Sequence, residues 1–178
     1  MVTPSSDERR WRELIRAVPD FPEAGVLYRD ITPLLHDSDA LRAANDALAA
    51  VAEQMSATVI AGIESRGFIF GVAVAERLGL PFVPVRKGGK LPAETESVSY
   101  DLEYGTDTLE LHRDPPIGGH RVVVVDDLLA TGGTAEAAGK LVRALGGEAA
   151  GYAFLVELTA LAGRERLAGS PVSALVQF

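Results

Sequence analysis

The 178-residue chain contains no cysteine. This absence excludes disulfide bonds and catalysis by a thiolate. It fits a reducing compartment, and we expect a cytoplasmic location. No apolar run reaches the roughly eighteen residues that a membrane-spanning helix needs, so we expect no membrane partner. Residues 1–12 are polar and charged rather than a basic end followed by an apolar stretch, so we expect no secretory signal.

Positive charge is also scarce, because 17 basic residues stand against 25 acidic ones and leave a net charge of −8. Nucleic-acid surfaces are normally basic, so we expect no nucleic-acid partner. A small anionic ligand is still compatible, since a few backbone N–H groups and cations suffice to bind it. Apolar residues make up 47% of the chain, far too many for a disordered protein.

The chain shows no internal repeat, low-complexity tract or linker, and we expect one domain over residues 1–178. Periodicity predicts alternating helices and strands, with an irregular stretch at 21–33 and a polar, mobile loop at 87–97. We expect helices at 7–18, 39–55, 67–78 and 134–145, and strands at 58–63, 82–86, 99–104, 108–112, 122–125, 149–157 and 173–177. Strands that are apolar on both faces and separated by helices indicate an α/β fold with a mostly parallel sheet. Ligands bind such sheets beyond the carboxyl ends of the strands.

Two acids follow the most apolar of these strands. The four valines at 122–125 favour a buried strand and run directly into Asp126 and Asp127. Neighbouring carboxylates at a strand end suit a diol, because each oxygen accepts hydrogen bonds from hydroxyl groups.

A small, glycine-containing loop comes next and leads into a predicted helix. Gly132 and Gly133 permit backbone conformations that expose N–H groups, and the hydroxyls of Thr131 and Thr134 add donors. Such a loop at a helix N-terminus can hold a phosphate monoester. The alternative is an ordinary strand–turn–helix with solvated acids. The GxxxxGK[ST] and GxGxxG patterns are both absent.

The whole stretch VVVVDDLLATGGT resembles the phosphoribosyl-pyrophosphate motif of the type I phosphoribosyltransferases. The resemblance implies a central, mostly parallel sheet flanked by helices, with a small N-terminal hood at about 19–35 and a flexible loop at about 87–99. It also implies that Asp126 and Asp127 bind the ribose 2- and 3-hydroxyls. The residues implied to bind the 5-phosphate are Ala130, Thr131, Gly132, Gly133 and Thr134.

Five further segments resemble, in the same order, those of the adenine-specific members of this family. They are FPEAGVLYRDITPLL (21–35) as the hood, ESRGFIFG (64–71) as the pyrophosphate loop, RKGGKLP (86–92) as the flexible loop, YDLEYG (100–105) as the catalytic hairpin, and VELTALAGRERL (156–167) as the C-terminal segment. The likeness covers the chain from Arg16 on. Gly88 departs from the family pattern and should loosen the loop without removing a ligand.

Pyrophosphate binding is implied for two of these segments. Ser65 and Arg66 follow a strand, where they can present N–H groups and a cation, and a cis peptide bond is frequent there in the family. Arg86, Lys87 and Lys90 would cover the leaving anion as part of a lid. The alternative for Arg66 is a surface arginine, and the other three cations, taken alone, would be interpreted as a solvated face.

Adenine binding is implied for the hood and for one residue of the phosphate motif. Tyr28 would stack on the purine, Leu27 and Arg29 would contact its edge through backbone groups, and Leu128 would cover the other ring face. Tyr28 could instead be a packing residue of the hood. Glu103 would bond the imidazole nitrogen of the base and, with Arg66, form the catalytic pair. Its alternative is a solvated strand carboxylate.

The implied reaction joins adenine to 5-phosphoribosyl 1-pyrophosphate and gives AMP and pyrophosphate, a step of purine salvage. Mg²⁺ would bind mainly through substrate oxygens, with no direct protein ligand. The resemblance also suggests a homodimer. Two alternatives stay open: transfer to another purine, against which the hood and Glu103 argue, and a non-catalytic regulator that senses the sugar pyrophosphate. The chain has no spare domain or basic patch for the second.

Overall fold

The computed structural model describes residues 5–101 and 106–178. The chain divides into two compact units, Met1–Ala47 and Leu48–Phe178, which are described in turn. In the described part of the chain, no helix has the length and apolar character that crossing a membrane requires.

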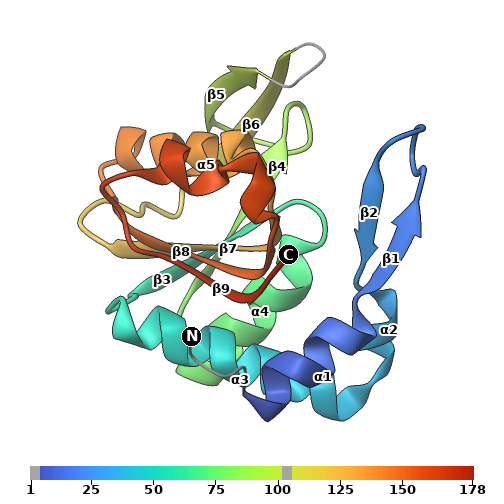
Figure 1. The fold of residues 1–178 in the computed structure, drawn as a ribbon. Helices are drawn as coiled ribbons and strands as arrows, with labels where there is room; N and C mark the ends of the chain where they lie inside the picture. The colour runs from blue at the N-terminus through green and yellow to red at the C-terminus, as the bar shows by residue number, and fades with distance from the viewer. Residues whose placement is uncertain (1–4, 102–105) are drawn as a thin grey trace. The chain divides into compact units, whose positions relative to one another are not determined.

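The N-terminal unit consists of short helices and one hairpin (Figure 1). Its elements are α1 (Ser6–Leu14), β1 (Arg16–Pro19), β2 (Leu27–Asp30), α2 (Thr32–His36) and the first part of α3 (Ser38–Gln54). The Oγ of Ser5 caps α1 by accepting a hydrogen bond from the N–H of Glu8 at 3.0 Å. The indole N–H of the buried Trp11 donates to the carbonyl of Ala40 at 3.1 Å and ties α1 to α3.

The expected helix at 7–18 is wrong over its last turn. The helix ends at Leu14, and Arg16 begins a strand that pairs antiparallel with β2. The expected irregular stretch at 21–33 accordingly contains the strand β2 and the start of α2. The cause is tertiary, because cross-strand hydrogen bonds and the Arg16–Asp30 ion pair satisfy backbone and side chains that a longer helix would have used locally.

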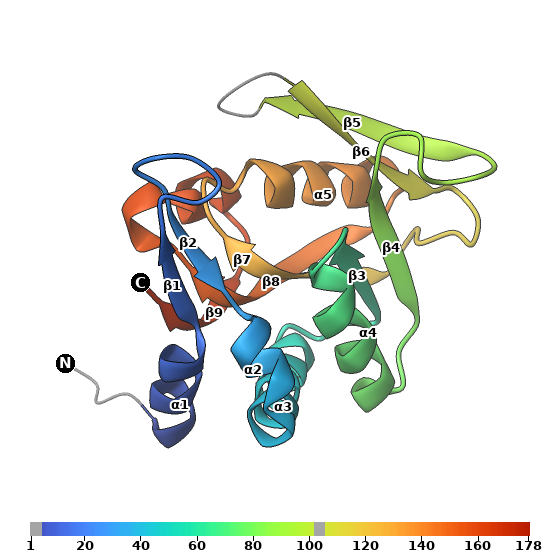
Figure 2. The same cartoon turned by 90° about the vertical axis from the view of Figure 1, so that its right-hand side faces the viewer.

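The second unit is built on a seven-stranded sheet in the order β5-β6-β4-β3-β7-β8-β9 (Figure 2). The strands are β3 (Val59–Ile63), β4 (Phe82–Lys87), β5 (Thr95–Asp101), β6 (Thr106–His112), β7 (Arg121–Leu129), β8 (Glu148–Glu157) and β9 (Val172–Gln177). The neighbouring strands β4, β3, β7, β8 and β9 pair in parallel. Strand β6 pairs antiparallel with both β4 and β5. Helix α4 (Gly67–Leu78) covers one face and α5 (Gly133–Ala144) the other. The predicted mostly parallel α/β fold is confirmed.

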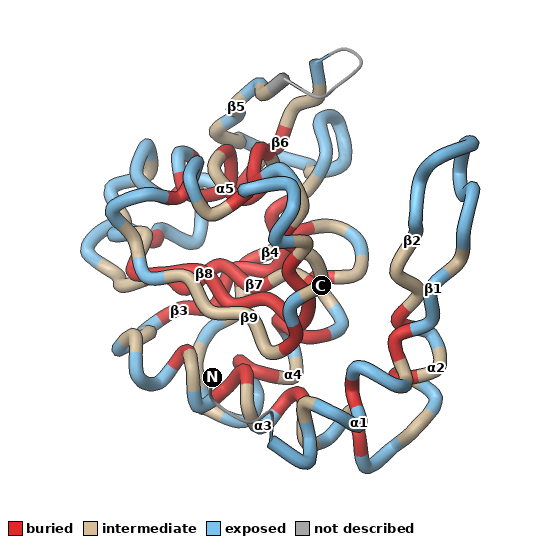
Figure 3. Tube along the Cα trace, viewed as in Figure 1, coloured by how far each residue is buried: buried red, intermediate tan, exposed pale blue. Residues whose placement is uncertain are grey.

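The core lies along the middle strands (Figure 3). The valines at 122–125 are completely buried, and every residue of β3 is buried as well. A strand that is enclosed on both faces and hydrogen-bonded on both edges cannot shift its register without exposing apolar side chains. The central strands therefore hold their carboxyl ends in a rigid arrangement.

Strand boundaries beside the expected loop at 87–97 differ from the sequence expectation. Strand β4 runs through Lys87 and β5 begins at Thr95, because β5 pairs with β6 from Thr95↔His112 onward. Only residues 88–94 remain between strands. The last part of the expected strand at 99–104 lies outside the described residues, as does Glu103. Strand β7 extends four residues beyond Val125, because it pairs with β8 as far as Leu129↔Glu157.

Candidate active site

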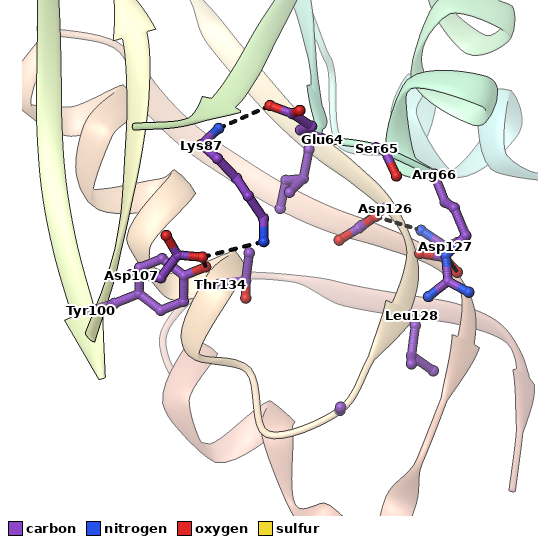
Figure 4. A pocket seen from close by; sticks show the side chains of 12 residues that line it. Glu64, Ser65, Arg66, Lys87, Tyr100, Asp107, Asp126, Asp127, Leu128 and Thr134 are labelled. Atoms are coloured by element: carbon purple, nitrogen blue, oxygen red, sulfur yellow. Dashed lines mark hydrogen bonds and ion pairs between the residues drawn. The ribbon is translucent and has the colours of Figure 1, made fainter. Parts of the chain in front are cut away.

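A polar pocket of about 460 Å³ opens at the carboxyl ends of β3 and β7 (Figure 4). The two strands are parallel neighbours, with Gly62 opposite Val125, so the segments that follow them meet at one edge of the sheet. The volume lies in the range of small-molecule sites. Of the predicted site residues, the pocket brings together Ser65, Arg66, Lys87, Asp126, Asp127, Leu128, Ala130 and Thr134.

The two acids of the motif both line the pocket. Asp127 is buried, and its Oδ2 lies 3.0 Å from Nε of Arg66. Oδ1 of Asp126 accepts a hydrogen bond from the backbone N–H of Asp127 at 2.9 Å. Burial raises the pKa of both carboxyls, and the neighbouring charge of Asp127 raises that of Asp126 further. A ligand that donates hydrogen bonds to these oxygens would favour their ionised form.

The loop after β7 leads into the N-terminus of α5. The helix has Gly132 as its N-cap, with φ of 84°, and no side chain caps it. The first amides of a helix have no partner within the helix and carry its positive dipole end. The loop residues surround a smaller cavity of about 80 Å³, lined among others by Thr131, Gly132 and Gly133. This geometry can bind a phosphate group.

The segment after β3 faces the acids from the opposite side. The peptide bond between Glu64 and Ser65 is cis, at the place where the family resemblance implied one. Ser65 and Arg66 both line the pocket, and α4 begins immediately after them. Ser65 and Arg66 thus add hydrogen-bond donors to the pocket beside the carboxylates of β7.

The three expected cations of the loop occupy different positions. Lys87 lines the pocket, where its Nζ lies 3.4 Å from Oδ2 of Asp107. Arg86 instead pairs with Glu64, at 3.1 Å between Nε and Oε2, and donates to the carbonyl of Lys90. The hydrogen bond from Arg86 lowers the pKa of Glu64. Among the described residues that line the pocket, neither Arg86 nor Lys90 occurs.

Sequence reasoning missed four residues that line the pocket, namely Ile63, Glu64, Tyr100 and Asp107. Tyr100 and Asp107 are directly opposite in the β5–β6 hairpin, and the Tyr100 hydroxyl donates to Oδ2 of Asp107 at 3.4 Å. Asp107 belongs to no motif, so only the strand register could have found it. Tyr100 belongs to the segment YDLEYG, in which a functional role was predicted for Glu103 only.

The predicted adenine contacts Leu27, Tyr28 and Arg29 lie on β2, in the N-terminal unit. The ring of Tyr28 packs edge-on against Phe21, with 5.1 Å between ring centroids. This contact gives Tyr28 a packing partner within the hairpin, and its stacking on a base stays a prediction. Leu27 is about half exposed.

The raised pKa of Asp126 generates a prediction about stability. The unfolded chain ionises this carboxyl near its ordinary pKa of 3.8, whereas the folded protein holds the proton to higher pH. Stability therefore falls as pH rises through this interval, because the native state binds more protons there. We expect Asp126→Asn to be more stable than the wild type at pH 7, with the difference narrowing toward pH 4. Urea unfolding at several pH values measures this.

Glu53 is exposed, and Glu53→Gln serves as the control. It should change the free energy of unfolding by no more than about 0.5 kcal/mol at any of these pH values. An Asp126→Asn protein that is less stable than the wild type at pH 7 would show that the carboxylate is stabilised by its surroundings.

Comparison with known proteins places this geometry in a family. The family model described as "Phosphoribosyl transferase domain" matches residues 32–172. A curated protein of Francisella tularensis subsp. holarctica, named adenine phosphoribosyltransferase, is 57% identical over 166 residues, which cover 92% of this chain and 95% of that protein. A protein of the same name from Solibacter usitatus is 53% identical over 94% of this chain and 96% of its own length.

Solved structures agree with the sequence relatives. The adenine phosphoribosyltransferase of Thermoanaerobacter pseudethanolicus superposes with a TM-score of 0.92 at 51% identity, covering 96% of this chain and 99% of that one. The enzyme of Saccharomyces cerevisiae, solved with adenine and an imino-altritol bisphosphate, gives a TM-score of 0.91 at 38% identity, covering 96% and 98%. The pocket, the sheet around it and these likenesses together show that the chain belongs to the adenine phosphoribosyltransferases, within the phosphoribosyltransferase family.

Proposed function

We propose that this chain transfers the phosphoribosyl group of 5-phosphoribosyl 1-pyrophosphate to adenine, releasing AMP and pyrophosphate in purine salvage. The observation that carries the proposal is the meeting of two adjacent carboxylates, Asp126 and Asp127, with an uncapped helix N-terminus in one pocket. Relatives support it as well. The Saccharomyces cerevisiae enzyme was solved with adenine, and that of Trypanosoma brucei with AMP, pyrophosphate and ribose 5-phosphate.

The sugar would bind along the end of β7. Asp126 and Asp127 accept hydrogen bonds from the 2- and 3-hydroxyls, and the amides at the start of α5 bind the 5-phosphate. The residues proposed for the phosphate are Ala130, Thr131, Gly132, Gly133 and Thr134. The acids and this loop are only a few residues apart in the sequence. They can therefore contact the hydroxyls and the 5-phosphate of the same ribose phosphate.

The pyrophosphate would lie on the β3 side of the pocket. Ser65, Arg66 and Lys87 line that region and supply a hydroxyl and two cations. Arg86 and Lys90 stay predictions for the same group. The ion pair of Arg86 with Glu64 would have to open for Arg86 to take part.

The reaction breaks the bond between ribose C1 and the pyrophosphate oxygen, and the bonding electrons leave with that oxygen. A bond between C1 and an imidazole nitrogen of adenine forms, while the proton of that ring is lost from the base. Arg66 and Lys87 would stabilise the negative charge of the departing pyrophosphate. Glu103, assigned from sequence resemblance alone, would bond the imidazole side of the base and accept the proton. Alignment of base, sugar and leaving group lowers the barrier further.

Recognition of the base is proposed for four residues. Tyr28 would stack on the purine, Leu27 and Arg29 would contact its edge through backbone groups, and Leu128 would cover its other face. Adenine presents a donor amine next to an acceptor ring nitrogen, so a backbone carbonyl and N–H in sequence can recognise it.

Mg²⁺ is proposed as the cofactor. Within residues 5–101 and 106–178, no group of three or more His, Asp or Glu side chains could hold a metal ion. The chemistry of the donor set nevertheless fits, because Mg²⁺ prefers carboxylate and phosphate oxygens and is commonly held by one or two carboxylates together with substrate phosphates. Asp126 and Asp127 would lie near it. When bound, the ion neutralises charge on the sugar pyrophosphate.

A homodimer is proposed from two side chains of α4. Ile69 and Val72 are 42% and 49% exposed and lie one helical turn apart, on the same face. Large apolar side chains that share an exposed face favour contact with another protein surface. A cytoplasmic location is part of the proposal, because the multiply charged sugar pyrophosphate cannot cross a bilayer unaided.

The test of the proposed function is a turnover assay with a panel of bases. Adenine, hypoxanthine, guanine, xanthine, uracil and orotate are each offered with 5-phosphoribosyl 1-pyrophosphate and Mg²⁺, and pyrophosphate release is measured. We expect adenine to give a kcat/KM at least a hundredfold above every other base, since a site that hydrogen-bonds one base leaves its polar groups unpaired with another. Preference for another purine would reassign the base, and binding of the sugar pyrophosphate without turnover would indicate a regulator.

Glu103→Gln tests the proposed proton transfer. Glutamine keeps the size of the side chain and some hydrogen bonding, but it cannot accept the proton. General acid–base groups contribute roughly a hundred- to ten-thousandfold, so kcat should fall by at least about a hundredfold. KM for adenine should change little. Steady-state kinetics of both protein forms measure this. A changed KM with normal kcat would limit Glu103 to recognition, and no change would leave it a surface carboxylate.

Val72→Glu tests the proposed dimer. A charge placed at the centre of an apolar interface is costly to desolvate, so we expect the variant to be a monomer at concentrations where the wild type has twice the mass of one chain. Light scattering coupled to size exclusion measures the mass. Leu161, which is 44% exposed, provides the control Leu161→Glu, and this protein should stay dimeric. A monomeric wild type contradicts the proposal directly.

A further inference from the structure

The C-terminal segment VELTALAGRERL matched the family in sequence but had no role in the site. In the structure, part of it lies directly behind the loop that leads into α5. Gly163 begins the short helix η2 (Gly163–Leu167), and its backbone contacts the backbone of that loop. A Cβ atom on Gly163 would lie 2.2 Å from the carbonyl oxygen of Ala130, and one on Gly132 would lie 2.4 Å from the carbonyl oxygen of Gly163. Only two glycines permit so close an approach.

An ion pair to a buried carboxylate anchors the segment that carries Gly163. The guanidinium of Arg164 donates to both carboxylate oxygens of Glu157, at 2.6 and 2.7 Å, and to the carbonyl of Val172 at 2.6 Å. Glu157 is 3% exposed and also accepts a hydrogen bond from the amide of Gln177 at 2.9 Å. Although burial opposes ionisation, these donors lower the pKa of Glu157, so the carboxylate is charged. A buried carboxylate with this many partners holds them in one geometry.

The anchor is connected to the loop through the sheet. Glu157, at the end of β8, is the register partner of Leu129, which is the last residue of β7 before the loop. The backbone N–H of Leu158 also donates to the carbonyl of Leu129 at 2.9 Å. The position of Gly163 is therefore set by the same two strands that set the start of the loop.

We propose that Gly163, held by the Arg164–Glu157 pair, is a positioning residue for the 5-phosphate loop. This inference rests on the proposed function. The loop contains two glycines, has no side-chain cap at Gly132, and would otherwise sample many backbone conformations. Contact with the backbone of Gly163 confines the Gly132 peptide, so the amides at the start of α5 point into the phosphate cavity before the ligand arrives. Confinement before binding lowers the entropic cost of binding.

The substitution Gly163→Ala in the full chain tests the proposal. The added methyl group must displace the carbonyl of Ala130 and with it the loop. We expect the Kd for ribose 5-phosphate, measured by calorimetry, to rise at least about tenfold, which equals the loss of one hydrogen bond to a charged group. The Kd for pyrophosphate should stay within about twofold, since that anion uses the β3 side. In kinetics, KM for the sugar pyrophosphate should rise more than kcat falls.

Gly118→Ala is the matched control. A Cβ at Gly118 would meet the carbonyl of Leu145 at an ordinary 3.5 Å, and Gly118 lines neither the pocket nor the loop cavity. This variant should bind ribose 5-phosphate and pyrophosphate as the wild type does.

A second pair of variants keeps the test decisive if Gly163→Ala does not fold. Arg164→Lys retains the charge beside Glu157 but loses the two-pronged hydrogen bond, so it should weaken ribose 5-phosphate binding in the same direction. Arg166→Lys is its control, because Arg166 reaches Glu136 only at 3.8 Å on the surface.

The inference is overturned if the folded variant, either Gly163→Ala or Arg164→Lys, binds ribose 5-phosphate like the wild type. It is also overturned if affinity for pyrophosphate falls equally, because that result indicates general damage. A wild-type protein that binds no ribose 5-phosphate refutes the proposed function itself. The two failures are therefore distinguishable.

Discussion

The parallel pairing of β7 with β3 on one side and β8 on the other is the constraint on which the rest of the structure depends. The valines at 122–125 are completely buried, so β7 cannot slide relative to its neighbours. Three strand ends consequently lie next to one another. The end of β3 leads to Ser65 and Arg66, the end of β7 carries the paired acids, and the end of β8 carries Glu157.

The two buried carboxyl groups of the pocket oppose the stability that the valines provide. Burial raises the pKa of Asp126 and Asp127, so their ionised forms are unfavourable in the folded protein. At Glu157, by contrast, a guanidinium and an amide lower the pKa of a buried acid. The two places differ in the hydrogen-bond donors that surround the carboxyl groups. Glu157 is satisfied within the protein, whereas the acids of the pocket would gain their full set of donors from a sugar.

The pocket is lined by more acidic than basic side chains, which bears on how an acidic protein could bind a polyanion. Arg66 pairs with Asp127 and Lys87 with Asp107, so each of these cations is already partly neutralised. The side chains of the lining therefore provide no excess of positive charge. Backbone amides at the start of α5 carry no counter-charge, and their orientation contributes correspondingly more to anion binding. This is consistent with a loop at the start of α5 that contains glycines and no lysine.

The sequence by itself determined the central strands and the helices α3, α4 and α5, and it placed two acids and a glycine-containing loop between a strand and a helix, because these features depend on local periodicity and on neighbouring residues. Tertiary structure decided what depends on pairing between distant segments. The strand at Arg16 replaced a helix turn because β2 offered it partners, and Asp107 reached the pocket only through its register with Tyr100. Arg86 forms an ion pair with Glu64, which is 22 residues away in the sequence. The backbone contact of Gly132 with Gly163 likewise needed the fold, since no local pattern predicts which two glycines will meet.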